Sequence, residues 1–189
     1  YYSNKIIIEM AKKNNLRVFD IKTNNINGGS TQYFICKKDS LHKTKSKLIS
    51  SILKKEKKMK LGNKKTFFKF FNQINILKSR IIKYLDKIIL AKRTIHGYGA
   101  STKGNVLLQY FGISRKHIKF IADRNPKKNN HYTPGTKMKI ITEARSRKLL
   151  PDFYFVLPWH FKKEILKREK KLIKKGCKFI FPLPSFKVY

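Results

Sequence analysis

The sequence has few cysteines and no long apolar run. Its two cysteines, Cys36 and Cys177, lack the spacing of metal ligands and fall in separate apparent strands. We interpret both as small buried residues and expect no metal site in this chain. No apolar stretch is long enough to span a bilayer, and no signal peptide is apparent. These absences predict a soluble, cytoplasmic protein with no membrane partner.

Acidic residues are also scarce. The chain has 10 Asp and Glu against 46 Lys and Arg, which gives a formal net charge of +36. Such a charge is typical of proteins that bind nucleic acids. The excess is mostly lysine spread along the chain, whereas arginine, which reads base edges and clamps phosphates, is sparse. We therefore interpret most of the charge as a solvated surface and expect no specific nucleic acid partner.

The chain is nevertheless long and apolar enough to fold. With 189 residues and 41% hydrophobic residues, it can form one domain, or one domain and a piece of another. Residues 1–39 begin with a helix that Ser3 caps and continue with two apparent strands, 16–21 and 31–36. One helix and two strands cannot bury both faces of a sheet. We interpret residues 1–39 as the C-terminal remnant of a larger α/β domain.

Residues 40–92 carry apolar side chains at three- and four-residue steps, the period of an amphipathic helix. A break at 61–63 divides the segment in two. The stripe predicts a helical connector whose apolar face packs on a domain core; a partner-binding or membrane-surface face is the alternative. The stripe comprises Leu48, Ile49, Ile52, Leu53, Phe67, Phe68, Phe71, Ile74, Leu77, Ile81, Leu85 and Ile88.

Residues 93–189 alternate short apolar strands with helices. This pattern predicts an α/β fold with a Rossmann-like parallel sheet, so we divide the chain into 1–39, 40–92 and 93–189. The expected strands are 93–96, 118–123, 139–141, 153–157 and 177–181, and the expected helices begin near 103 and span 162–175.

A glycine-rich stretch, 97–104, joins the first of these strands to a helix. Glycines let a backbone approach a ligand closely, and the unpaired N–H groups at a helix start favour an anion. Lys103 adds a positive charge. The glycine spacing departs from both the dinucleotide and the P-loop patterns. A phosphate cradle and a tight turn without a ligand therefore both stay open at this point.

Ligands of such folds bind at the carboxyl ends of the parallel strands. Asp123 stands roughly 20 residues past the glycines, where these folds place the acid that binds a ribose hydroxyl. Helix capping or pairing with Arg124 is the alternative. His160 follows a strand end and is either a ligand contact or a helix cap. His96 lies inside a strand, and we interpret it as structural.

Five blocks of residues stand in order over about half of the chain. They are Gly97 to Asn105, Ala122 to Pro126, Tyr132 to Thr136, Leu157 to Phe161 and Gly176 to Pro184. Together they resemble the C-terminal domain of the S-adenosylmethionine-dependent sugar C-methyltransferases. The opening Tyr1-Tyr2-Ser3 and the Gly28-Gly29-Ser30 loop resemble the end of the methyltransferase domain of the same family.

The resemblance implies a three-part enzyme: a zinc-binding module, a methyltransferase domain that holds S-adenosylmethionine, and this Rossmann-like domain. It implies methylation of a carbon beside the ketone of a nucleotide-linked sugar, with a Glu-His pair as the base. That pair, the donor-binding glycine loop and the zinc cysteines are absent from the chain as given. We therefore expect a fragment or truncated homologue without catalytic residues, inactive without its N-terminal methyltransferase half.

The strand ends and the resemblance together predict the residues that meet the nucleotide-linked sugar. They are Gly97, Tyr98, Gly99, Ala100, Ser101, Lys103, Asp123, Arg124, Trp159 and His160. The resemblance further implies that a second group faces the active site of the complete enzyme, the alternative being a terminus and a plain turn. That group is Tyr1, Tyr2, Gly28, Gly29 and Ser30.

A function of another class is also open from the sequence. The chain can be interpreted as a non-catalytic basic α/β module that binds RNA or another polyanion. Phenylalanines interleaved with lysine in residues 67–71 suit this alternative, because exposed aromatic rings stack on bases.

Overall fold

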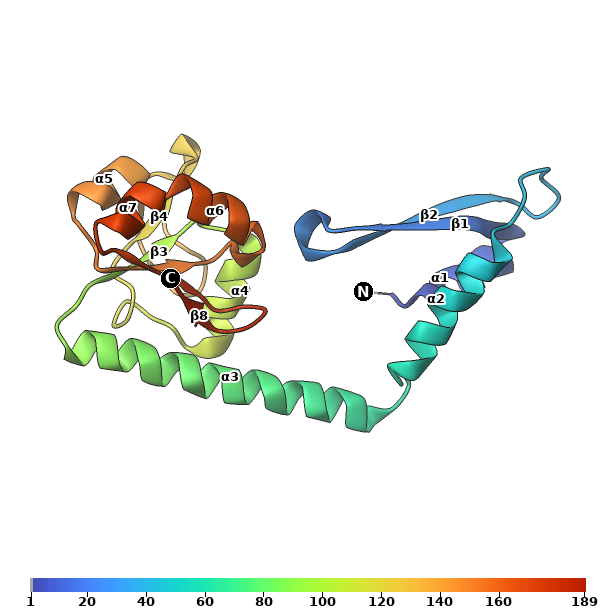
Figure 1. The fold of residues 1–189 in the computed structure, drawn as a ribbon, viewed down its shortest axis with the longest axis horizontal. Coiled ribbons are helices and arrows are strands. Elements are labelled where there is room, and N and C mark those ends of the chain that lie inside the picture. The colour runs from blue at the N-terminus through green and yellow to red at the C-terminus, as the bar shows by residue number, and fades with distance from the viewer. Residues whose placement is uncertain (1) are drawn as a thin grey trace. The chain divides into compact units, whose positions relative to one another are not determined.

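The computed structural model describes residues 2–189, apart from the side chain of residue 27, so the prediction for Tyr1 lies outside the described residues. The chain forms two compact units, Tyr1–Gln73 and Ile74–Tyr189 (Figure 1). The predicted α/β class is confirmed. Among the described residues, no helix is long and apolar enough to cross a membrane.

In the first unit a helix packs against a two-stranded antiparallel sheet. Ser3 caps the helix, because its Oγ accepts the Ile6 N–H at 3.3 Å. Ala11, Val18 and Ile21 form the small core. The elements are α1 (Asn4–Lys13), β1 (Leu16–Asn24), the 3-10 turn η1 (Ile26–Gly28), β2 (Ser30–Lys37) and α2 (Ser46–Lys58).

Helix α2 is tied to α1 and packs within the first unit. The Glu56 carboxylate accepts the N–H of Asn4 at 2.7 Å and of Lys5 at 2.9 Å. These bonds satisfy two of the donors that the start of a helix leaves unpaired. Ile49 and Ile52 also pack against the core of the unit.

The second unit contains a six-stranded sheet in the order β5-β4-β3-β6-β7-β8. Five strands are parallel and β8 is antiparallel to β7. Chain order reverses between β3 and β6, as in Rossmann sheets that bind dinucleotides. The strands are β3 (Ile95–Tyr98), β4 (Ile121–Asp123), β5 (Ile140–Thr142), β6 (Phe153–Val156), β7 (Lys178–Phe181) and β8 (Lys187–Val188).

Helices cover both faces of this sheet (Figure 1). Along β6, Phe153 and Phe155 join a core with residues of α3 and α4, whereas Tyr154 and Val156 join a core with residues of α6 and α7. Burial on both faces accounts for the continuous apolar run of β6. The helices are α3 (Lys64–Leu90), α4 (Thr102–Phe111), α5 (Glu143–Lys148), α6 (Lys162–Arg168) and α7 (Lys170–Lys174), with the 3-10 turns η2 (Pro126–Lys128) and η3 (Trp159–Phe161).

The apolar stripe predicted to pack on a core does so at Ile49 and Ile52 of α2 and in the second half of α3, but not at the start of α3. Ile81 and Leu85 of α3 are 0% exposed. Phe67 and Phe68, near the start of the same helix, are 54% and 69% exposed. The prediction is therefore wrong for these phenylalanines, because α3 extends past the core that its C-terminal half covers.

The turn within the glycine-rich stretch is shorter than the sequence predicts. Gly97 and Tyr98 belong to β3, and Gly104 lies inside α4, so only residues 99–101 form the turn. The predicted helix over 162–175 is divided at Glu169, which ends α6 and begins α7. Helix α5 and strand β8 were not predicted.

Candidate functional site

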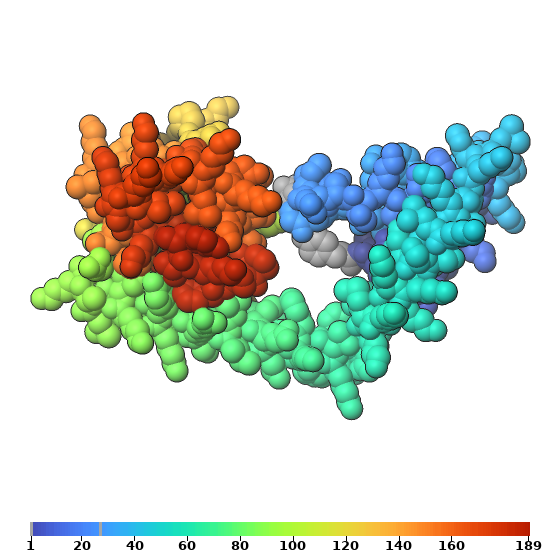
Figure 2. All heavy atoms as spheres, in the orientation of Figure 1, coloured from blue at the N-terminus to red at the C-terminus, as the bar shows by residue number. Residues whose placement is uncertain are grey.

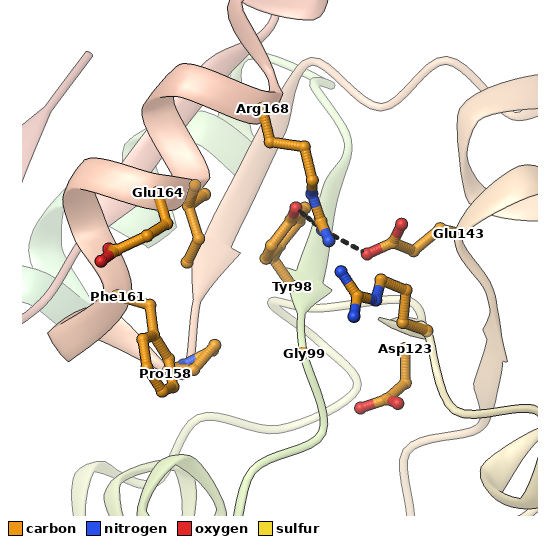
Figure 3. Close-up of a pocket in the computed structure, with 10 residues that line it drawn as sticks. Tyr98, Gly99, Asp123, Glu143, Pro158, Phe161, Glu164 and Arg168 are labelled. Atoms are coloured by element: carbon orange, nitrogen blue, oxygen red, sulfur yellow. Dashed lines mark hydrogen bonds and ion pairs between the residues drawn. The ribbon is translucent and has the colours of Figure 1, made fainter. Parts of the chain in front are cut away.

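A cleft of about 380 Å³ opens at the carboxyl ends of β3, β4 and β6 (Figure 3). It lies at the reversal of strand order, where open α/β sheets bind their ligands. Four of the ten residues predicted to meet the substrate line it: Tyr98, Gly99, Asp123 and Arg124. Pro158, which follows β6, lines it as well. The remaining lining residues are Glu143, Phe161, Glu164, Ile165 and Arg168.

The glycines beside the cleft are explained by internal packing. Gly99 has a left-handed φ of 78°, and a Cβ there would lie 2.9 Å from Pro158. A Cβ on Gly104 would lie 2.3 Å from the Leu157 Cβ, so this glycine lets α4 approach the end of β6. A tight βα turn therefore accounts for the glycine pattern, and the case for a ligand depends on the cleft.

Asp123 stabilises the glycine turn through hydrogen bonds. Its carboxylate accepts the Ala100 N–H at 2.7 Å through Oδ2 and the Asn125 N–H at 2.7 Å through Oδ1. Lys128 Nζ lies 3.4 Å from Oδ2 and donates to the Ala100 carbonyl at 2.8 Å. Both carboxylate oxygens thus have partners, and the pairing with Arg124 that the sequence left open is replaced by pairing with Lys128.

A network of two arginines, two glutamates and a tyrosine lies along the wall of the cleft. Glu169, which is 3% exposed, accepts the Tyr98 hydroxyl at 2.7 Å, Arg168 Nε at 3.0 Å and an Arg147 nitrogen at 2.9 Å. Arg168 also donates to the Tyr98 hydroxyl and binds Glu143 at 2.6 Å (Figure 3). The two guanidinium groups balance the two carboxylates, which is what burial of charge requires.

This network fixes the protonation of Tyr98. Burial, followed by the hydrogen bond to Glu169, raises the pKa of the Tyr98 hydroxyl far above its ordinary value. Tyr98 therefore stays protonated at neutral pH and cannot serve as a base. Arg168, although it lines the cleft, is already neutralised by Glu143 and Glu169.

Arg124 differs from Arg168 in having no neutralising partner. It is exposed, and its guanidinium makes no ion pair or hydrogen bond with another described residue. Glu164 is the corresponding carboxylate of the cleft without a described partner. Phe161 and Ile165 supply an apolar wall. Such a combination suits a ligand with an apolar ring, an anionic group and hydroxyls.

The other predicted residues lie outside this lining. Ser101 caps α4, because its Oγ accepts the Gly104 N–H at 3.1 Å. Lys103 occupies the first turn of the same helix, and Trp159 packs on both cores of the unit. Burial, then the charge of Lys103, lowers the pKa of His160. In the described chain, His160 Nδ1 and Asn105 Oδ1 are the buried side-chain atoms that lack hydrogen-bond partners.

His96 is a structural histidine by its contacts, as we interpreted it. It is 2% exposed, and its Nδ1 lies 2.8 Å from the Ser146 hydroxyl, which in turn lies 2.8 Å from the Tyr154 hydroxyl. Burial lowers the pKa of His96 to about 4, with the charge of Lys119 as the lesser cause. A neutral imidazole enclosed in this way does not reach a substrate.

The second predicted group belongs to the first unit. Tyr2 is 70% exposed. Gly28 and Gly29 form the turn between β1 and β2 with φ of 88° and 123°. Ser30 donates its hydroxyl to the Ile26 carbonyl at 3.0 Å. Their place in an active site stays a prediction.

The sequence analysis missed five cleft residues for a common reason. Each lies on a helix or turn that follows a strand. The prediction considered only the residues at the strand ends and left out the side chains of the helices that follow. Phe161, Ile165 and Arg168 recur at four- and three-residue steps, which place them on one side of a helix. That spacing was the available signal.

A metal ion would need a cluster of ligands, and S-adenosylmethionine would need a free acid for its ribose. Within the described part of the chain, no three His, Cys, Asp or Glu side chains are grouped as metal ligands. Both cysteines are half-buried rather than buried, and neither forms a disulfide. The acid that could bind a cofactor ribose, Asp123, is occupied by backbone N–H groups and Lys128.

The sequence is similar to known proteins over most of its length. Residues 25–184 match the family model described as the C-methyltransferase C-terminal domain. The chain is 27% identical over 188 residues to the C-methyltransferase NovU of Streptomyces niveus. The match covers 100% of this chain and 44% of that protein, so the chain spans less than half the length of its curated relative.

Proposed function

The chain belongs to the C-methyltransferase C-terminal domain family, and on that premise we propose that it is the substrate-side part of an S-adenosylmethionine-dependent enzyme. The substrate is a nucleotide-linked ketosugar, methylated at a carbon beside its ketone. The observation that carries the proposal is the cleft at the reversal of strand order, which contains Arg124, whose guanidinium has no partner among the described residues.

In this proposal the cleft holds the nucleotide end of the substrate. The base packs against Phe161 and Ile165, and the guanidinium of Arg124 binds a phosphate, since arginine matches phosphate oxygens in geometry and charge. Glu164 accepts a hydroxyl or N–H group. Lys103, at the start of α4, adds positive charge without entering the cleft.

Binding of the nucleotide, which does not react, serves catalysis by positioning the sugar. The free energy of binding the nucleotide orients the sugar for the chemical step. The proposal assigns no base to the cleft, because Tyr98 stays protonated and Glu164 is assigned to binding the substrate. S-adenosylmethionine supplies the methyl group when bound, and we assign that cofactor, the base and the zinc implied by the resemblance to parts of the enzyme outside this chain.

We also propose the cytoplasm as the compartment. Two cysteines that form no disulfide suit a reducing environment.

The experiment is calorimetric titration of the 189-residue chain with dTDP and UDP, with inorganic pyrophosphate as the comparison. The proposal expects saturable binding of at least one nucleoside diphosphate, and weaker binding of pyrophosphate because it lacks the ring that packs on Phe161. Equal binding of all three ligands, lost together as salt rises from about 50 to 200 mM, would instead favour the basic polyanion-binding module.

A further inference from the structure

The first two turns of α3 expose a group of phenylalanines. Phe67, Phe68 and Phe70 have 54%, 69% and 57% of their surface exposed. At about 100° per residue these three side chains cover an arc of roughly 160° on one side of the helix. We call this group the phenylalanine face. Teal atoms of this segment lie at the molecular surface in Figure 2.

The phenylalanine face stands in a strongly basic segment. Residues 54–69 contain eight lysines and one acidic residue, Glu56. The Glu56 carboxylate is directed to the start of α1, where it accepts the N–H groups of Asn4 and Lys5. No acidic side chain of this segment is therefore left to neutralise the lysines, and the local charge is strongly positive.

Shape and charge together limit what covers this face. Like charges disfavour a second copy of a chain whose formal net charge is +36. Single-stranded nucleic acids are held in a positively charged groove, whereas this face is the convex side of a helix. A convex aromatic face among lysines is the composition of helices that lie in the interface of anionic membranes.

We propose that the phenylalanine face docks on the surface of a bilayer that contains anionic phospholipids. The aromatic rings enter the boundary between headgroups and acyl chains, and lysines of residues 54–69 meet the lipid phosphates. Such attachment needs no membrane-spanning helix. It replaces the expectation of no membrane partner, which rested on the absence of a long apolar run.

The test is co-sedimentation of the 189-residue chain with vesicles of phosphatidylcholine and phosphatidylglycerol, mixed about 7:3, and with vesicles of phosphatidylcholine alone. We expect binding only to the anionic vesicles. The double variant Phe67→Ser/Phe68→Ser should bind at least tenfold more weakly. The matched control is Leu149→Ser/Leu150→Ser, which removes apolar side chains that are 49% and 78% exposed elsewhere, and which should bind normally.

A second pair of variants separates local from overall charge. Lys57→Gln/Lys58→Gln/Lys64→Gln should weaken binding more than the same loss of charge on α7. The α7 variant is Lys170→Gln/Lys171→Gln/Lys174→Gln. Unchanged melting temperatures establish that all variants fold. Titration with dTDP should be unaffected by these substitutions, because none of the substituted residues lines the cleft, which keeps the test independent of the proposed substrate site.

Three results would overturn the proposal. The first is no binding to anionic vesicles. The second is equal weakening by the Phe67/Phe68 and Leu149/Leu150 variants. The third is loss of single-stranded RNA binding in the Phe67/Phe68 variant with vesicle binding intact, which would assign the face to nucleic acid.

Discussion

Arg124 is the residue whose replacement tests the cleft most selectively. Because its guanidinium has no described partner, Arg124→Gln should leave the fold intact. We expect dTDP affinity to fall about tenfold, since a hydrogen bond to a charged group contributes roughly 1.5–3 kcal/mol and 1.4 kcal/mol is a factor of ten. The control, Lys127→Gln, removes the same charge from the neighbouring turn η2. Equal losses from both variants, measured by calorimetry, would mean that only overall charge matters.

His96 gives the fold a dependence on pH. Its pKa is about 4 in the folded chain, against an ordinary value of 6.5. Between these values the unfolded chain binds the extra proton, so stability is complete above pH 6.5 and falls as the pH falls toward 4. A difference of 2.5 pKa units corresponds to about 3 kcal/mol.

Urea unfolding of the chain between pH 4.5 and 7.5 measures this effect. We expect a smaller pH slope in His96→Asn, even if that variant is less stable throughout. An unchanged slope would show that His96 is not the group responsible. Acidic residues with lowered pKa, such as Asp152, lose their contribution only near or below pH 3.8 and fall outside this window.

At single residues, the sequence predicted the strand ends better than the role of each side chain. Tyr98, Gly99, Asp123 and Arg124 do line one cleft, because parallel strands end at one edge of a sheet. The occupation of Asp123 by Lys128 and two N–H groups depends on loop geometry that no spacing encodes. Gly99 is likewise a poor place for a test of binding, because a side chain there meets Pro158 and strains the turn.

Helix α3 carries a contrast between two positions that the sequence pattern treats alike. Leu85 is 0% exposed and Phe68 is 69% exposed. We expect Leu85→Ala to reduce the free energy of unfolding by about 2–5 kcal/mol through lost burial and a cavity. Phe68→Ala should change it by less than about 0.5 kcal/mol, as surface substitutions usually do. Chemical denaturation of both variants checks this; equal losses would mean that Phe68 is also part of a core.

At the level of elements, strong apolar periods were predicted and short polar pieces were missed. Helix α1 and all strands except β8 were predicted from runs of apolar residues, and the structure contains them. Strand β8 has two residues and exists only through pairing with β7, a contact that local sequence does not contain. The division between α6 and α7 at Glu169 accompanies burial of its carboxylate beside Tyr98, which depends on tertiary packing.

For the whole molecule, we expect that the chain does not bind S-adenosylmethionine. Its first unit has only α1, α2 and a two-stranded sheet before the start of α3. In the second unit the carboxylate of Asp123, which could bind a cofactor ribose, already accepts the Ala100 N–H. Calorimetric titration should show no saturable heat at micromolar concentrations. Micromolar binding would contradict the assignment of the cofactor to the rest of the enzyme.

The central claim is that this chain holds a nucleotide-linked sugar in the cleft of its second unit. Amide chemical shifts of the 15N-labelled chain, recorded during titration with a dTDP-linked sugar, test it most directly. The account predicts saturable shifts at Gly99, Arg124, Phe161 and Glu164, with little change in residues 54–71, and loss of the shifts in Arg124→Gln. Shifts confined to residues 54–71 or spread over surface lysines, or none at all, would contradict it.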